Sequence, residues 1–185
     1  KMSGLVLSPS PLTLDVGATG PLSAGITPAN TTDKSLDWSS SDTAVATVDQ
    51  SGQVKAIAPG TATITAKARD RSGITAQAAV TVNKLNYDMG NVVWSAGEFA
   101  YDGTEKSVSL IGLPQGLTPA YTGNTATDAG SYTASVSFKS DNPNYEVPAM
   151  PDMNWVIYKT VYDMNDVNWV FPESSTYDGT EKSVY

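Results

Sequence analysis

The stretch TATITAKAR, residues 61–69, decides the fold class of this chain. Apolar Ala and Ile alternate along it with Thr and Lys, which is the period of a β-strand with one buried face. Within residues 4–82, further short alternating segments are separated by Gly, Pro, Asn, Asp and Ser, and none carries apolar residues at helical spacing. The sequence therefore predicts an all-β fold.

A β-hairpin is predicted just before this strand. The alternating segments 44–48 and 53–57 flank the tetrapeptide DQSG (49–52). Its last residue, Gly52, can adopt a positive φ at little cost, as a tight turn requires. Short strands that follow one another at such spacing are typical of two packed sheets.

The motifs of the first half, in chain order, are LVLSPSPLTLDVG (5–17), WSSSD (38–42), VATVD (45–49), PGTA (59–62), ITA (64–66) and AVTV (79–82). Together they resemble the bacterial Ig-like group 2 domain over nearly all of residues 1–83. The resemblance implies an Ig-like β-sandwich with Trp38 in its core. It also implies a spacer or interaction module, because such domains occur in bacterial surface proteins, adhesins and multi-domain extracellular enzymes.

The rest of the chain contains an internal repeat. The octapeptide YDGTEKSV occurs at residues 101–108 and 177–184, and the tripeptide YDM at 87–89 and 162–164. The copies are about 75 residues apart, which exceeds the period of a solenoid repeat and suffices for a small domain. The sequence therefore predicts three parts: a domain at 1–83, a repeat module at 84–159, and the truncated first strands of the next copy at 160–185.

The start of the repeated octapeptide is interpreted as a turn. Asp-Gly between β-prone residues is a strong hairpin signal, because both central residues of a type I′ turn need a positive φ. We therefore assign Tyr101-Asp102-Gly103 and Tyr177-Asp178-Gly179 to structural hairpin turns. Further strands are predicted at 117–122, 131–138 and 154–158, where apolar and polar residues alternate.

A second group of motifs lies within residues 87–159: YDGT (101–104), LP (113–114), YTGN (121–124), DAGSYT (128–133) and NY (144–145). They resemble the YDG-type repeat modules of large bacterial surface proteins. The resemblance implies a small β-rich module related to the β-grasp. A β-grasp includes a helix, whereas residues 123–152 show no helical pattern, so we expect few helical residues.

Composition excludes several classes of function. The chain has no Cys and no His, which removes the usual zinc sites, thiol nucleophiles and Ser-His-Asp triads. The net charge is −8, and the 11 Lys and Arg residues are scattered without a cluster that could follow a phosphate backbone. No apolar run of membrane-spanning length is present. We therefore expect no nucleic-acid partner, no membrane contact by this segment, no cofactor and no enzyme activity.

Three kinds of chemistry compete with the structural interpretation. The carboxylates of residues 102–105 could bind calcium, but a calcium loop needs about six oxygens and this motif offers two carboxylates. Lys106 could form an isopeptide bond with an Asn beside a buried acid, but strand alternation places Lys106 in solvent. Glycoside hydrolysis needs two carboxylates across one cleft, for which a module of this size leaves little room. The candidates for such a pair are Asp128, Asp141, Glu146 and Asp152.

Aromatic side chains are the remaining candidates for ligand binding, because their rings can stack on sugar rings. Trp94 and Trp169 occupy equivalent positions of the repeat, which favours a shared packing role. Trp155 and Tyr145 stay open as surface aromatics that contact a surface glycan or a host protein. Burial in the core is the alternative for both.

The organisation of the chain points to a structural role. The truncated copy from residue 160 offers two strands with nothing to cover them, which predicts intermolecular β pairing or a crystal contact. The connections at 83–86 and 159–161 contain no Gly/Ser-rich tether, which favours domains in a stiff series. The sequence thus predicts a non-catalytic structural or spacer segment, a stalk or adhesin-like part of a bacterial cell-surface or secreted protein. The alternatives are a carbohydrate- or host-protein-binding module and an accessory segment of an extracellular glycan-degrading enzyme.

Overall fold

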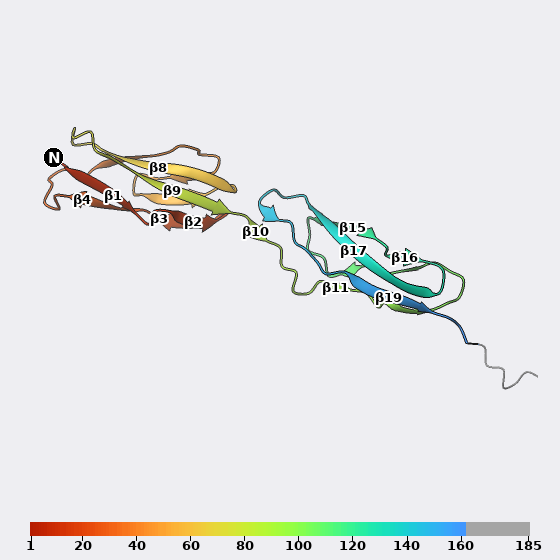
Figure 1. The fold of residues 1–185 in the computed structure, drawn as a ribbon. Coiled ribbons are helices and arrows are strands. Elements are labelled where there is room, and N and C mark those ends of the chain that lie inside the picture. Colours follow the sequence, from red (N-terminus) through yellow and green to blue (C-terminus); the bar gives the residue numbers. More distant parts are fainter. Residues whose placement is uncertain (162–185) are drawn as a thin grey trace, which may run out of the picture.

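The computed structural model describes residues 1–161, and this part of the chain is built from β-strands without a helix. Figure 1 shows two units that follow each other end to end, the first from β1 to β9 and the second from β10 to β19. Within the described residues, no strand of one unit pairs with a strand of the other. The predicted all-β fold class is confirmed. None of the described residues lies in a helix that could cross a membrane.

One layer of the first unit is a four-stranded sheet. Its strands, in spatial order, are β2 (Leu12–Asp15), β9 (Thr75–Asn83), β8 (Gly60–Ala68) and β5 (Leu36–Ser40). β2 runs parallel to β9, and the other neighbours are antiparallel. β8 contains the alternating stretch that predicted the fold class, and its Ala62, Ile64, Ala66 and Ala68 are buried as expected.

The remaining strands of the first unit form two smaller groups. They are the pair β1 (Gly4–Ser8) and β4 (Ser23–Thr27), and the three strands β3 (Thr19–Pro21), β7 (Gln53–Ala56) and β6 (Ala46–Val48). β6 and β7 are the predicted hairpin, with Val48 opposite Val54. Gly52 has a φ of 86°, and a Cβ there would lie 3.0 Å from the Trp38 ring. The hairpin prediction is therefore confirmed.

The core of the first unit lies between these layers. Its larger buried side chains are Leu5, Leu7, Leu12, Leu22, Trp38, Val54, Ile64, Val80 and Val82. All but Leu22, which lies between β3 and β4, come from β1, β2, β5, β7, β8 and β9, so both layers contribute. Trp38 is 8% exposed, which confirms that it is a core residue. This arrangement is the predicted β-sandwich.

The second unit also centres on a four-stranded sheet. Its strands, in spatial order, are β12 (Glu98–Ala100), β19 (Met153–Tyr158), β17 (Gly130–Ser140) and β15 (Leu117–Thr122). Three short pairs accompany it: β10 (Leu85–Asn86) with β18 (Tyr145–Glu146), β11 (Val93–Trp94) with β14 (Leu110–Ile111), and β13 (Lys106–Ser107) with β16 (Thr125–Ala126). The strands predicted at 117–122, 131–138 and 154–158 correspond to β15, β17 and β19.

The core of the second unit is small. Val108, Ala134, Trp155 and Ile157 are buried, and partly buried Trp94, Phe99, Tyr132 and Met153 pack against them. Within residues 84–161 no helix covers the sheet, so the helix of a β-grasp has no counterpart in the described residues. Val108 lies between β13 and β14 and packs on the sheet residues instead.

The chain connection between the two units is a single residue, Lys84. The carbonyl oxygen of Asn83 accepts a hydrogen bond from the Val16 N–H at 3.1 Å, which ties Asn83 into the first unit. The Leu85 N–H donates to the Asn144 carbonyl at 2.8 Å, which ties Leu85 into the second. The Lys84 ammonium lies 3.7 Å from the Glu146 carboxylate. The connection therefore has almost no free length.

Candidate functional site

The repeated Tyr-Asp-Gly motif forms a turn held by the Asp102 side chain. One carboxylate oxygen, Oδ1, accepts hydrogen bonds from the Thr104 N–H at 2.9 Å and the Thr104 hydroxyl at 2.6 Å. The other, Oδ2, accepts from the Lys106 ammonium at 2.6 Å. Asp102 thus bonds the backbone two residues on, as expected for a structural turn.

The turn is not a hairpin, and this corrects the sequence prediction. β12, before the motif, pairs in parallel with β19, while β13, after it, pairs with β16. Gly103 has a φ of 79°, but Arg71 is the one non-glycine residue with a positive φ among residues 1–161. A type I′ turn needs a positive φ at both central positions. The Asp102 hydrogen bonds stabilise a different bend. This bend connects β12, which pairs with β19, to β13, which pairs with β16.

The same contacts explain the ionisation of Asp102. The hydrogen bond from the Lys106 ammonium, followed by those from Thr104, holds the pKa of the Asp102 carboxyl well below its ordinary value of 3.8. Both carboxylate oxygens therefore already have protein donors. Within residues 1–161, no group of three or more acidic side chains is arranged to hold a metal ion. The Lys106 side chain is 17% exposed, less than the solvent position predicted from strand alternation.

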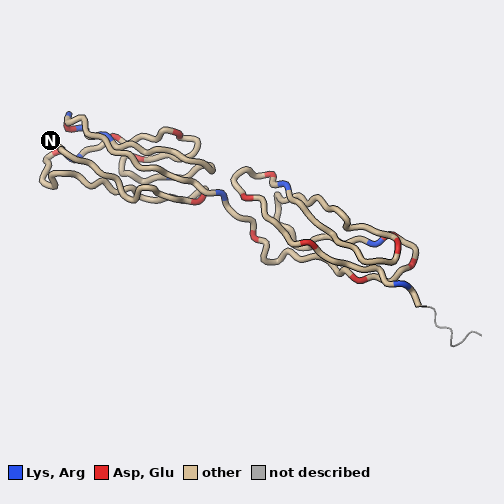
Figure 2. The backbone as a smooth tube through the Cα atoms, viewed as in Figure 1, with Lys and Arg blue, Asp and Glu red and all other residues tan. Residues whose placement is uncertain are grey.

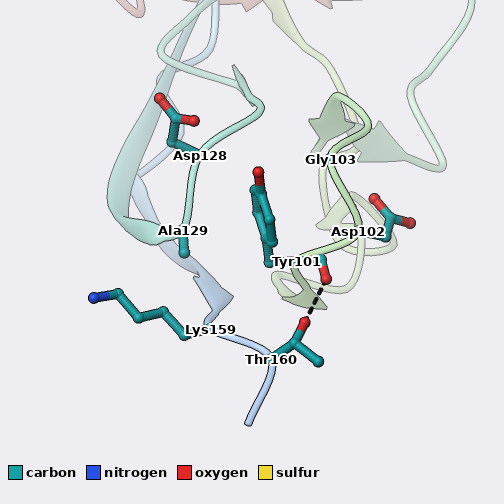
Figure 3. A pocket seen from close by; sticks show the side chains of 7 residues that line it. All are labelled: Tyr101, Asp102, Gly103, Asp128, Ala129, Lys159 and Thr160. Carbon is teal, nitrogen blue, oxygen red and sulfur yellow. Dashed lines mark hydrogen bonds between the residues drawn. The ribbon is translucent and has the colours of Figure 1, made fainter. Parts of the chain in front are cut away.

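A pocket of about 700 Å³ opens beside this turn (Figure 3). It is lined by Tyr101, Asp102, Gly103, Asp128, Ala129, Lys159 and Thr160. The Tyr101 backbone closes one side, because its N–H donates to the Tyr158 carbonyl at 2.9 Å and its carbonyl accepts from the Thr160 hydroxyl at 2.6 Å. The pocket therefore lies where the chain leaves the second unit.

The four candidate carboxylates for glycoside hydrolysis are not gathered at one place in the described residues. Asp128 lines the pocket beside Tyr101, near the end of the second unit. Glu146 lies next to Lys84, at the start of that unit. Asp141 directly follows β17, and Asp152 directly precedes β19. The described residues thus give no support to a catalytic pair among the four.

Tyr145, a predicted ligand-contacting residue, lies in another pocket at the start of the second unit. It is partly buried, and its ring centroid is 4.6 Å from that of Tyr87 at an interplanar angle of 31°. The Tyr87 hydroxyl is fixed by contacts to the Gly116 carbonyl at 3.1 Å and the Ser140 hydroxyl at 2.7 Å. Polar side chains of this pocket are those of Asn86, Asp88, Gln115 and Asn142. Tyr145 is therefore partly engaged in packing, and its role toward a ligand stays a prediction.

Trp155 belongs to the core, which corrects its choice as a candidate ligand-contacting residue and agrees with the alternative of core burial. It is 2% exposed, and its indole N–H donates to the Gly123 carbonyl at 3.0 Å. Its ring meets Tyr132 at 4.9 Å and Phe99 edge-on at 5.9 Å between centroids. Strand alternation along β19 directs Trp155 and Ile157 to the same buried face. The ring is not free to stack on a ligand.

Trp94 is partly buried and packs against the core of the second unit. Its indole N–H donates to the Pro151 carbonyl at 3.1 Å, as expected for a packing role. The equivalent Trp169 and the second turn motif, Tyr177-Asp178-Gly179, lie outside the described residues. The predicted strand pairing of the copy from residue 160 also falls there, apart from Thr160 and Val161.

Lys159 and Thr160 were not singled out from the sequence. They reach the pocket because β12 pairs in parallel with β19, which brings residues 98–100 beside residues 156–158. A parallel pairing between segments so distant in the chain leaves no local pattern. The one signal in the sequence was the repetition of Tyr101, a residue that is 40% exposed.

Charge is distributed unevenly between the units (Figure 2). Lys1 and Arg71 lie together in the first unit, where the Lys1 ammonium donates to the Arg71 carbonyl, while Asp and Glu outnumber Lys and Arg in the second unit. No basic stripe follows the chain in the part that the structure describes.

Residues 3–82 match the family model of the bacterial Ig-like domain (group 2). The matched segment spans β1 to β9, the whole of the first unit. The resemblance predicted for this part of the chain is therefore confirmed. The match does not extend to the second unit.

Curated relatives match over a similar length. An uncharacterized protein of Clostridium acetobutylicum is 40% identical over 83 residues, or 45% of this chain and 9% of that protein. A 3-O-alpha-D-galactosyl-alpha-L-arabinofuranosidase of Bifidobacterium longum is 46% identical over 69 residues, or 37% of this chain and 6% of the enzyme. An Ig-like virion protein of Serratia phage KSP90 is 41% identical over 70 residues, or 37% of this chain and 27% of that protein. The chain thus spans a small part of each relative.

Solved structures give weaker similarities. Domains 5–6 of the S-layer protein SbsC align with 87% of this chain and 99% of their own, at 13% identity and a TM-score of 0.38. The fibronectin(III)-like modules of Clostridium thermocellum CbhA align with 84% of this chain and 95% of theirs, at 12% identity and a TM-score of 0.32. TM-scores below 0.5 do not establish a shared arrangement.

Proposed function

We propose that this chain is a non-catalytic spacer segment of a bacterial cell-surface or secreted multi-domain protein. The division that fits this function is an Ig-like domain at 1–83, a YDG-type β module at 84–159, and a further copy of that module beginning at residue 160. Support for the copy comes from the repeated octapeptide at 101–108 and 177–184. In this role the units act by their number and spacing, as a stalk that holds other parts of the protein at a distance.

The junction at Lys84 is the observation that carries this proposal. Asn83 is hydrogen-bonded within the first unit and Leu85 within the second, so one residue separates two hydrogen-bonded frameworks. A flexible linker would need several residues without such bonds. A short, bonded connection restricts how far two units can rotate against each other, which suits a segment that sets distance.

Spin-label distance measurements test this proposal. The chain has no Cys, so the double variant Thr13→Cys/Thr118→Cys carries a label at one exposed position in each unit. A narrow distance distribution is expected. A variant with Gly-Ser-Gly-Ser inserted after Lys84 is the control and should broaden it. If the two distributions are equally broad, the junction is flexible and the stalk function is wrong.

A second candidate is an accessory segment of an extracellular glycan-degrading enzyme. Two arabinofuranosidases of Bifidobacterium longum contain sequences 46% and 39% identical to parts of this chain, which favours this candidate. The two functions differ in whether the whole protein also contains a glycan-degrading enzyme domain. Purification of the natural protein and assay for release of arabinose from arabinan would distinguish them, with protease treatment of intact cells showing whether the segment is displayed outside.

A further inference from the structure

Several residues of the repeated motif have a structural role, whereas the exposed side chains of Tyr101 and Glu105 have none in the described residues. Asp102 holds the turn, Gly103 supplies the positive φ, Lys106 pairs with Asp102, and Val108 is fully buried. The Tyr101 backbone makes two hydrogen bonds, but any residue could make them. Tyr101 is 40% exposed, and its hydroxyl has no hydrogen bond among the described residues. The fold alone therefore does not explain why this position is a tyrosine, or why the same residue recurs at the second copy of the motif.

The surroundings leave the Tyr101 ring accessible. Figure 3 shows it standing in the pocket, with Asp128 and Ala129 on one side and Gly103 on the other. Gly103 has no side chain, and a Cβ there would meet nothing within 4 Å. Ala129 carries only a methyl group. Small residues thus flank the ring, and a flat ligand could lie against it.

The polar groups at the rim define the chemistry of such a ligand. The Asp128 carboxylate and the Lys159 ammonium have no partner within residues 1–161, so one acceptor and one donor are available at the rim of the pocket; Figure 3 shows the Lys159 side chain extending away from the Tyr101 ring. Asp102 is already occupied by Thr104 and Lys106, and Figure 3 shows it pointing away from the ring. A cation would meet Lys159, and a polyanion would meet Asp128 in a unit rich in acidic residues.

We propose that this pocket binds a neutral glycan, with a sugar ring stacked on Tyr101. An apolar sugar face matches the ring, while Asp128 accepts hydrogen bonds from hydroxyl groups and Lys159 donates one. The glycan site is separate from the spacer function: the pocket could bind sugar whether or not the junction at Lys84 is rigid.

Affinity electrophoresis of the full 185-residue chain tests the proposal. The gels contain barley β-glucan, xylan or galactomannan as neutral probes and polygalacturonate as the anionic one. At least one neutral polysaccharide should retard the protein. Tyr101→Ala should weaken that binding about tenfold, while Tyr101→Phe, which keeps the ring, should stay within about twofold. Asp128→Ala should weaken it about fivefold, because one charged acceptor is lost.

Tyr158→Ala is the matched control, because Tyr158 is 52% exposed on the neighbouring strand but does not line the pocket. It should bind as the unchanged protein does, and circular dichroism should show all variants folded. The proposal is overturned if no neutral polysaccharide retards the protein, if only polygalacturonate does, or if Tyr101→Ala binds normally. If Tyr101→Ala and Tyr158→Ala lose affinity for the polysaccharide equally, the proposal is also overturned, because the binding surface would then lie elsewhere.

Discussion

The Leu85 N–H donates a hydrogen bond to the Asn144 carbonyl at 2.8 Å, so the second unit begins one residue after the last strand of the first. This bond joins the entry of the unit to the segment before β18, whose Tyr145 pairs in parallel with Leu85. The start of the unit is therefore fixed by residues about 60 positions later in the chain. The hydrogen bond at the junction therefore depends on the second unit being folded.

Leu85→Pro should loosen the junction. Proline has no N–H, so the bond to Asn144 is lost, and the free energy of unfolding of the second unit should fall by about 1 kcal/mol or more. Spin labels at positions 13 and 118 should report a broader distance distribution. Lys84→Ala is the control, because its exposed ion pair with Glu146 contributes less than about 1 kcal/mol. An unchanged distribution in Leu85→Pro would show that this hydrogen bond does not set the geometry.

Asp102 should make the stability of the second unit depend on pH. Its pKa is lower in the folded state than the ordinary 3.8, so its contribution is complete above that pH and is lost as the pH falls through the folded value. Thermal unfolding should show Asp102→Asn less stable than the unchanged protein at neutral pH, with the difference shrinking below pH 3.8. Lys106→Gln should weaken the same dependence, because Lys106 is the largest cause of the shift. Parallel curves for the unchanged protein and Asp102→Asn would contradict this assignment.

Local patterns predicted the strands but not all of their partners. The hairpin of β6 and β7, the buried face of β8 and the alternation in β17 were visible because a strand repeats every two residues and a tight turn needs particular residues. The parallel pairing of β12 with β19 joins segments that are far apart in the chain and has no such signature. The same pairing carries the chain away after Asp102, so the expected hairpin does not form.

Among the site residues, too, local patterns were predicted and contacts between distant segments were not. The Asp102 turn was visible because an Asp side chain bonds nearby backbone. The pocket beside it was not, because Lys159 and Thr160 reach Tyr101 through the β12–β19 pairing. Trp155 shows a further limit: alternation indicates which residues share a face of a strand, whereas burial of that face depends on what packs against it.

Trp155→Ala should unfold the second unit while leaving the first intact. Trp155 is 2% exposed and is the largest residue in a small buried cluster, so its removal should cost about 3–5 kcal/mol. Trp155→Phe should cost less, since an aromatic ring remains, although the Gly123 carbonyl loses its donor. Amide hydrogen exchange can follow the two units separately. Loss of protection in β8 together with β17 would show that the units do not unfold independently.

Alanine substitutions at Gly52 and Gly73 can distinguish two causes of lost stability in the first unit, backbone strain and steric crowding. Both have a positive φ, 86° and 77°, so alanine at either position should cost about 1 kcal/mol through backbone strain. A Cβ at Gly73 would meet nothing within 4 Å, whereas one at Gly52 would lie 2.6 Å from the Leu22 carbonyl oxygen and 3.0 Å from the Trp38 ring.

Gly52→Ala should therefore destabilise the first unit by about 3 kcal/mol, well beyond the cost of Gly73→Ala, because the hairpin must move off the Trp38 ring. Urea unfolding followed by fluorescence measures both variants. The triple variant Trp94→Phe/Trp155→Phe/Trp169→Phe serves as the background, so that Trp38 alone remains of the four tryptophans in the sequence. Equal losses of stability would mean that strain at positive φ accounts for both. In that case the close approach of the β6–β7 turn to Trp38 would not stabilise the sandwich.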